Sequence, residues 1–124
     1  MSANSDRVLE FIQAWNKKDF ERLLSFFAPG ARYHNIPMEP VEGVEAIRKS
    51  LEGFIGMASE IDWVVHHIGE SAEGVVMTER TDRFKIGDKW LELPVMGVFE
   101  LSGGSITGWR DYFDLGQFQS QMPQ

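Results

Sequence analysis

The sequence of 124 residues contains no cysteine, which excludes disulfide bonds, thiol nucleophiles and cysteine-ligated metals. Basic residues are also few, since 12 Lys and Arg stand against 19 Asp and Glu, for a formal net charge of −7 at pH 7. This charge repels nucleic acid and anionic lipid. No apolar run approaches the roughly 20 residues of a membrane span, and residues 1–7 do not resemble a signal peptide. We therefore expect a cytoplasmic protein without nucleic-acid or membrane partners.

Apolar residues make up 43% of the chain and aromatic residues 12%. A chain of this length can form one domain with one core. No linker, repeat or low-complexity segment interrupts it, so we expect a single domain over residues 1–124. The high aromatic content favours a core wide enough to contain a pocket.

The N-terminal half is typical of helices. Asn4 or Ser5 can cap a first helix, and Asp19 can cap a second helix that Pro29-Gly30 would end. A third helix is expected to begin at Gly43. Helical spacing predicts that each helix has one buried apolar face. The inward-facing residues are Val8, Phe11, Ile12 and Trp15 in the first helix, Phe20, Leu23, Leu24 and Phe27 in the second, and Val44, Ile47, Leu51 and Phe54 in the third.

The C-terminal half is typical of β-strands joined by hairpins, with a closing helical turn over 114–121. The expected strands are 31–36, 60–68, 74–84, 90–101 and 106–113. Helices placed first and sequential antiparallel strands placed last define an α+β fold. We expect a curved sheet wrapped over the helices, with a pocket on its concave side.

The segment Trp109-Arg110-Asp111-Tyr112-Phe113-Asp114 places an acid at the centre of an aromatic strand. Because side chains alternate along a strand, Trp109, Asp111 and Phe113 face the same way, and Asp114 faces the other way as a cap for the last turn. A carboxylate between two large aromatic side chains is costly to bury unless another group pairs with it.

A partner for this acid is available upstream, in Glu79-Arg80-Thr81-Asp82-Arg83-Phe84. By the same alternation Arg80, Asp82 and Phe84 share a face, and the planar guanidinium of Arg80 can bond both carboxylates. Two acids in one enclosed site titrate together and hold one proton between them, which provides an acid and a base at the same pH. These residues also fit a structural ion pair without function.

Two further polar residues, Tyr33 and Asn35, alternate onto one face of the strand expected over 31–36. A phenol and an amide two residues apart can hold a water molecule by complementary hydrogen bonds. The alternative is a tyrosine that bonds a loop and an asparagine that caps the turn at Pro37. A metal site is not expected, because the adjacent His66 and His67 face opposite sides of a strand. The expected apolar lining around the acids is Phe84, Leu93, Val95, Trp109, Phe113 and Phe118.

With these residues assembled, the chain resembles the limonene-1,2-epoxide hydrolase family. The resemblance covers roughly the whole chain. It is carried by the segments Tyr33-His34-Asn35-Ile36-Pro37, Thr78-Glu79-Arg80-Thr81-Asp82, Gly97-Val98-Phe99-Glu100-Leu101 and Ile106-Thr107-Gly108-Trp109-Arg110-Asp111-Tyr112-Phe113-Asp114-Leu115.

This resemblance implies a cone-shaped, cystatin-like or NTF2-like sheet, a homodimer, and cofactor-free, one-step hydrolysis of an apolar epoxide. It implies that Asp111 is the general base that deprotonates water, which Tyr33 and Asn35 help to hold. Asp82 is then the acid that protonates the epoxide oxygen, and Arg80 orients the two acids.

Two other functions remain open on the sequence. A ketosteroid-isomerase-like or polyketide-cyclase-like enzyme would use one aspartate to move a proton on a carbon acid, although the Tyr33 and Asn35 pair fits a bound water better than an oxyanion. A non-catalytic module would use the cone to bind an apolar ligand, although such a module has little reason to bury two acids.

Overall fold

The computed structural model describes residues 2–123. Within this range the elements are, in chain order, α1 (Ala3–Asn16), α2 (Phe20–Ser25), β1 (Phe27–Asn35), β2 (Val41–Glu42), α3 (Val44–Met57), β3 (Glu60–Glu70), β4 (Val76–Ile86), β5 (Lys89–Ser102), β6 (Ser105–Tyr112) and α4 (Leu115–Ser120). The expected α+β class is confirmed, and so is the order of helices first and long strands last.

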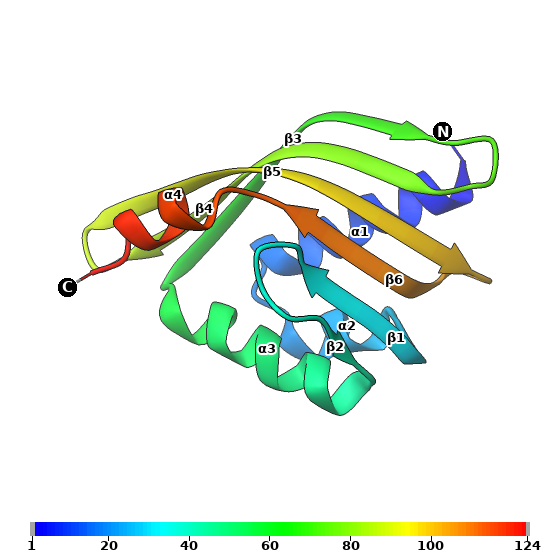
Figure 1. Ribbon diagram of the computed structural model, residues 1–124, viewed down its shortest axis with the longest axis horizontal. Helices are drawn as coiled ribbons and strands as arrows, with labels where there is room; N and C mark the ends of the chain where they lie inside the picture. Colours follow the sequence, from blue (N-terminus) through cyan, green and yellow to red (C-terminus); the bar gives the residue numbers. More distant parts are fainter. Residues whose placement is uncertain (1, 124) are drawn as a thin grey trace.

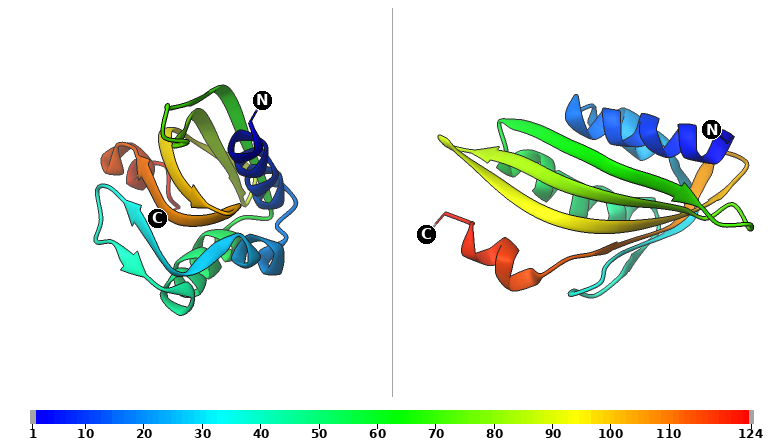
Figure 2. Two further views of the ribbon diagram at one scale, coloured as in Figure 1. Left: turned by 90° about the vertical axis from the view of Figure 1, so that its right-hand side faces the viewer. Right: turned by 90° about the horizontal axis from the view of Figure 1, so that it is seen from above.

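The strands form one six-stranded sheet in the order β2-β1-β6-β5-β4-β3. Strands β3 to β6 are antiparallel neighbours, as the hairpin signals predict, whereas β1 pairs in parallel with β6. The sheet is strongly curved, and α1 packs against β3 while α3 packs beneath β1 (Figure 1; Figure 2, left). The concave side is therefore enclosed by helices, while the convex side faces outward.

The first helix begins earlier than its sequence suggests. Ser2 is its N-cap and accepts a hydrogen bond from the Ser5 backbone N–H at 3.1 Å, so the predicted caps are wrong. The side chains of Asn4 and Ser5 are engaged elsewhere, because Asn4 donates to the Gly74 carbonyl and Ser5 donates to Glu70. These bonds tie α1 to the β3–β4 hairpin.

The boundary between α2 and β1 also differs from the prediction. Asp19 caps α2 as expected, but the helix ends at Ser25 and Phe27 is buried at the start of β1. The ladder between β1 and β6 changes register between Phe27 and Arg32, and this irregularity contains Pro29-Gly30. A proline cannot donate to the ladder, so it is accommodated at a bulge instead of ending a helix. The two-residue strand β2 lies between the strand expected over 31–36 and the helix expected from Gly43, and it is too short to show an alternating pattern in the sequence.

The core is an aromatic cluster between α1 and the concave face of the sheet. At its centre lies Trp109, which is fully buried. Its indole packs edge-on against Phe11 at 5.0 Å and stacks on Phe99 at 5.6 Å and on Tyr33 at 4.2 Å. Such pairs contribute beyond their buried area, so this cluster fixes which side chains of β1, β5 and β6 point inward.

Candidate active site

Five polar residues converge on the concave side of the sheet, next to this aromatic cluster. Tyr33 and Asn35 come from β1, Arg80 and Asp82 from β4, and Asp111 from β6, and all five are more than nine-tenths buried. The parallel ladder places Asn35 directly opposite Asp111. The structure thus brings together all five polar residues that the sequence singles out.

Arg80 lies between the two acids and bonds both of them. Its Nε and Nη2 donate to Asp82 at 2.9 and 2.8 Å, and Nη2 also donates to Asp111 Oδ2 at 2.9 Å. Its Nη1 donates to Thr78 Oγ1 at 3.0 Å, and the guanidinium lies 4.8 Å from the Trp63 ring centre. Burial opposes the charge of Arg80, but Asp111 and Asp82 outweigh it and raise the pKa of this guanidinium, which stays cationic.

The environment of Asp82 favours its protonated form. Burial raises the pKa of Asp82 to about 6, against the lowering effect of Arg80 and with a further rise from Asp111. Two carboxylates and one guanidinium leave an excess negative charge in this buried cluster. A proton on one acid relieves that excess, which is the general reason why neighbouring buried acids titrate together.

Asp111 is held from two sides. Arg80 bonds its Oδ2, and the indole Nε1 of Trp109 donates to its Oδ1 at 2.8 Å. Nearby, the Tyr33 hydroxyl donates to Asn35 Oδ1 at 3.1 Å, which leaves the Asn35 amide N–H groups to face other acceptors. Burial raises the pKa of Tyr33 far above its usual range, so the phenol remains a proton donor.

These groups border a narrow cavity, in which the centre of a water-sized sphere can occupy about 20 Å³, room for roughly one water molecule. Phe84, Leu93, Val95, Phe113 and Phe118 line it as expected. Trp109 does not, because it lies behind Asp111 with no exposed surface, and its predicted place in the lining is wrong.

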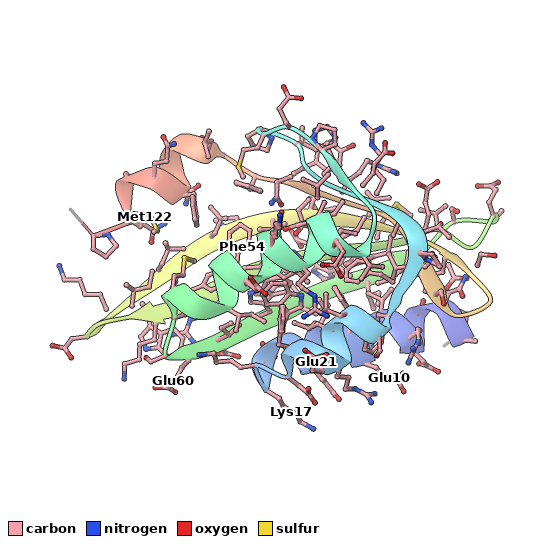
Figure 3. The ribbon with its side chains drawn as sticks, turned by 90° about the horizontal axis from the view of Figure 1, so that it is seen from below. Glu10, Lys17, Glu21, Phe54, Glu60 and Met122 are labelled. Atoms are coloured by element: carbon pink, nitrogen blue, oxygen red, sulfur yellow. The ribbon has the colours of Figure 1, made fainter. Side chains whose placement is uncertain are left out.

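Three lining residues were missed by the sequence analysis as pocket residues: Trp15, Phe54 and Trp63. Helical spacing identifies Trp15 and Phe54 as inward-facing, but it does not distinguish the core from the wall of a cavity. Figure 3 shows α3, which carries Phe54, crossing in front of the sheet. A second hollow, between α3 and the β1–β2 connection, shares Tyr33, Asn35 and Phe54 with the cavity.

The remaining predicted residues lie away from this cavity. Asp114 caps α4 by accepting from the Gln117 backbone N–H at 3.0 Å, as expected. His66 and His67 are exposed on β3. Among residues 2–123, no group of three or more histidines or acids is placed to hold a metal ion. No helix in the same range is long and apolar enough to cross a membrane.

The chain is similar to known proteins in sequence and in fold. The profile of the limonene-1,2-epoxide hydrolase catalytic domain matches residues 2–124. Epoxide hydrolase EphG of Mycobacterium tuberculosis is 34% identical over 109 residues, which are 85% of this chain and 69% of that protein. The solved structure of an LEH-like epoxide hydrolase of M. tuberculosis has a TM-score of 0.82 at 30% identity, over 95% of this chain and 87% of the other.

More distant structures share the fold alone. An NTF2-like protein of Burkholderia pseudomallei has a TM-score of 0.87 at 19% identity and covers 100% of both chains. A putative SnoaL-like polyketide cyclase of Shewanella putrefaciens has a TM-score of 0.83 at 17% identity, over 98% of this chain and 96% of the other.

The curved six-stranded sheet packed on helices places the chain in the NTF2-like class of folds. Within that class, the chain belongs to the limonene-1,2-epoxide hydrolase family. The expectation of an epoxide hydrolase is confirmed at the level of the family.

Proposed function

We propose that the protein hydrolyses an apolar, cyclic or terpene-like epoxide to a vicinal diol in one step, without a covalent intermediate and without a cofactor. The observation that carries this proposal is the bridge of Arg80 between two buried acids, one of which has a raised pKa. This arrangement supplies a proton donor and a proton acceptor at one wall of an apolar cavity.

In the proposed reaction, Asp111 is the general base and removes a proton from a water molecule. The water oxygen bonds one epoxide carbon while the bond from that carbon to the ring oxygen breaks. Asp82 is the acid and gives its proton to the departing oxygen. The step leaves Asp111 protonated and Asp82 ionised, so one proton returns from Asp111 to Asp82 before the next turnover.

Tyr33 and Asn35 are proposed to position the water. Because the Tyr33 hydroxyl donates to Asn35 Oδ1, the amide is oriented with its N–H groups free for the water oxygen. Asn35 and Asp111 are direct partners across β1 and β6, and in this proposal the Asn35 amide donates to the water from which Asp111 takes a proton. Each positioned acid or base contributes roughly 10²–10⁴-fold to such a reaction, and fixed geometry contributes further.

The cavity wall supports an apolar substrate. Apart from the polar site residues, its lining is aromatic and aliphatic. Such a lining binds hydrocarbon rings by removing their surface from water, and it excludes bulk water that would compete for the protons.

We also propose a homodimer formed through the convex side of the sheet. Met96 on β5 and Tyr112 on β6 are directly opposed on that side, and they are 46% and 44% exposed. Exposed apolar side chains that adjoin one another on a sheet face are typical of contact surfaces, whereas scattered ones are not. Light scattering coupled to size exclusion tests this, and a monomer at micromolar concentration contradicts it.

The first experiment measures diol formation from limonene oxide, cyclohexene oxide and styrene oxide by the wild type and by Asp111→Asn. Turnover by the wild type, lost in a folded Asp111→Asn variant, is the expected result. A single turnover in H₂¹⁸O separates the mechanisms, because direct attack by water labels the diol, whereas a carboxylate intermediate delivers an unlabelled protein oxygen first. If no epoxide is hydrolysed, the proposal fails, and proton exchange at a ketone α-carbon then tests the isomerase alternative.

A further inference from the structure

A glycine lies directly beneath the bridge between the two acids. Gly97 is on β5, the strand between β4 and β6 (Figure 1). Its partners in the two ladders are Thr78 on β4 and Asp111 on β6. Opposed residues of neighbouring strands point to the same side of a sheet, so the missing side chain of Gly97 would point toward Arg80.

Space, and not backbone conformation, explains why this residue is glycine. The glycines with a positive φ are Gly43, Gly74, Gly87, Gly103 and Gly104, so Gly97 has a backbone that other residues can adopt. However, a Cβ at Gly97 would lie 2.2 Å from Arg80 Nη1, 2.7 Å from Asp111 Oδ1 and 3.1 Å from Thr78 Oγ1. The first two distances are far inside van der Waals contact, so the guanidinium occupies the place of a side chain.

Thr78 holds the same guanidinium from behind. It is fully buried, and its Oγ1 accepts the 3.0 Å hydrogen bond from Arg80 Nη1. This leaves Nε and Nη2, at the other edge of the fork, to bond the two acids. Neither Thr78 nor Gly97 lines the cavity, so neither is placed to touch a substrate.

We propose that Gly97 and Thr78 form a guanidinium seat, a pair of positioning residues that sets where Arg80 meets Asp82 and Asp111. Gly97 supplies the space and Thr78 supplies the anchor. The seat acts on the reaction through Arg80. Tests of the seat that measure turnover therefore rest on the proposed function.

The test compares Gly97→Ala with Gly108→Ala, which adds the same methyl group on the adjacent strand. At Gly108 the new Cβ would meet Glu100 Oε2 at 2.8 Å, the end of a half-exposed side chain that can turn aside. Thr78→Val is the second variant, because it keeps the shape of Thr78 and removes the acceptor of Arg80. Thermal unfolding of each variant by circular dichroism establishes that it folds.

Displacement of the guanidinium predicts a loss of kcat with little change in KM. A misplacement of about 1 Å costs roughly 10²-fold in rate, which is the expected loss for Gly97→Ala. We expect a loss of about tenfold for Thr78→Val, which removes one hydrogen bond, and wild-type values for Gly108→Ala. Folded Gly97→Ala and Thr78→Val variants with wild-type kcat would overturn the seat.

The pH profile provides a readout that a packing defect would not move. The titratable groups that face the guanidinium are Asp82 on β4, Asp111 on β6 and Tyr33 on β1. Because Arg80 lowers the pKa of Asp82, its displacement moves the titration of Asp82 to higher pH in Gly97→Ala, less so in Thr78→Val, and not in Gly108→Ala.

Carboxyl ¹³C NMR titration follows Asp82 without any substrate, which separates the two proposals. If the wild type hydrolyses no epoxide but the Asp82 titration still moves in Gly97→Ala and not in Gly108→Ala, the proposed function fails and the seat stands. If the Asp82 titration is the same in the wild type, Gly97→Ala and Thr78→Val, the seat is wrong. Should Gly97→Ala fail to fold, Thr78→Val decides by the same criterion.

Discussion

The indole N–H of Trp109 donates a 2.8 Å hydrogen bond to Asp111, two residues further along the same strand. Both side chains point inward, and the indole has no exposed surface. Trp109 is therefore not placed to contact a substrate in the cavity, and we expect it to act on the site through the orientation of the Asp111 carboxylate. Its second contribution is to packing, through its stacks on Tyr33 and Phe99.

Trp109→Phe separates these two contributions, because phenylalanine keeps an aromatic ring and removes the donor. A hydrogen bond to a charged group contributes about 1.5–3 kcal/mol. We expect kcat to fall roughly 10-fold or more, with KM nearly unchanged. Steady-state kinetics on the best epoxide measure this, and Phe99→Leu, which alters the same cluster without touching Asp111, is the control. An equal loss of kcat in both variants would assign Trp109 to packing alone.

The pKa of Asp82 predicts the alkaline limb of the pH profile. A general acid must be protonated, and Asp82 holds its proton below a pKa of about 6. We expect kcat/KM to decline above about pH 6, approaching tenfold per pH unit as the protonated fraction falls. The profile is measured from pH 4 to 9 with a nonionisable epoxide, so that enzyme groups alone titrate. A kcat/KM that stays flat from pH 5 to 8 would show that Asp82 is not the proton donor.

The convergence of the polar side chains was predictable from the sequence because strand alternation is a strong rule. The rule puts Arg80 and Asp82 on one face of their strand, and Tyr33 and Asn35 on one face of theirs. It also puts Asp111 on the inward face of the last strand. Alternation shows which face of the sheet a side chain is on, but not how deeply that side chain is buried. For this reason Trp109 was expected in the cavity wall, although it lies behind Asp111.

The close approach of Arg80 to Gly97 could not be predicted from the sequence. A glycine within a strand has several possible explanations. The short distance between Arg80 and the position that a Cβ of residue 97 would occupy depends on how β4, β5 and β6 pair, which the sequence does not show. The same applies to the start of β1, where Phe27 continues the apolar spacing of α2 and the bulge at Pro29-Gly30 depends on pairing with β6.

The charge balance of the buried cluster predicts strongly non-additive stability. The cluster contains one guanidinium and two carboxyl groups, so Asp82→Asn or Asp111→Asn alone still leaves Arg80 paired with one acid. The double variant leaves a buried cation without a counter-charge, which costs about 3–5 kcal/mol. We expect the double variant to lose more free energy of unfolding than the two single variants together. Urea denaturation of all four proteins measures this, and additivity within about 0.5 kcal/mol would contradict a shared cluster.

The size of the substrate is predicted to depend on Phe118, which α4 holds over the cavity. Its ring packs against Phe54 on α3 and Phe113, at 6.3 Å from each, and it is not fully buried. Phe118→Ala removes this part of the wall while leaving the polar groups in place. We expect kcat/KM for limonene oxide to rise relative to that for cyclohexene oxide, because the larger substrate gains the vacated space. Phe20→Ala, on α2 and outside the cavity lining, is the matched control. An unchanged ratio in Phe118→Ala would mean that α4 does not limit the size of the substrate.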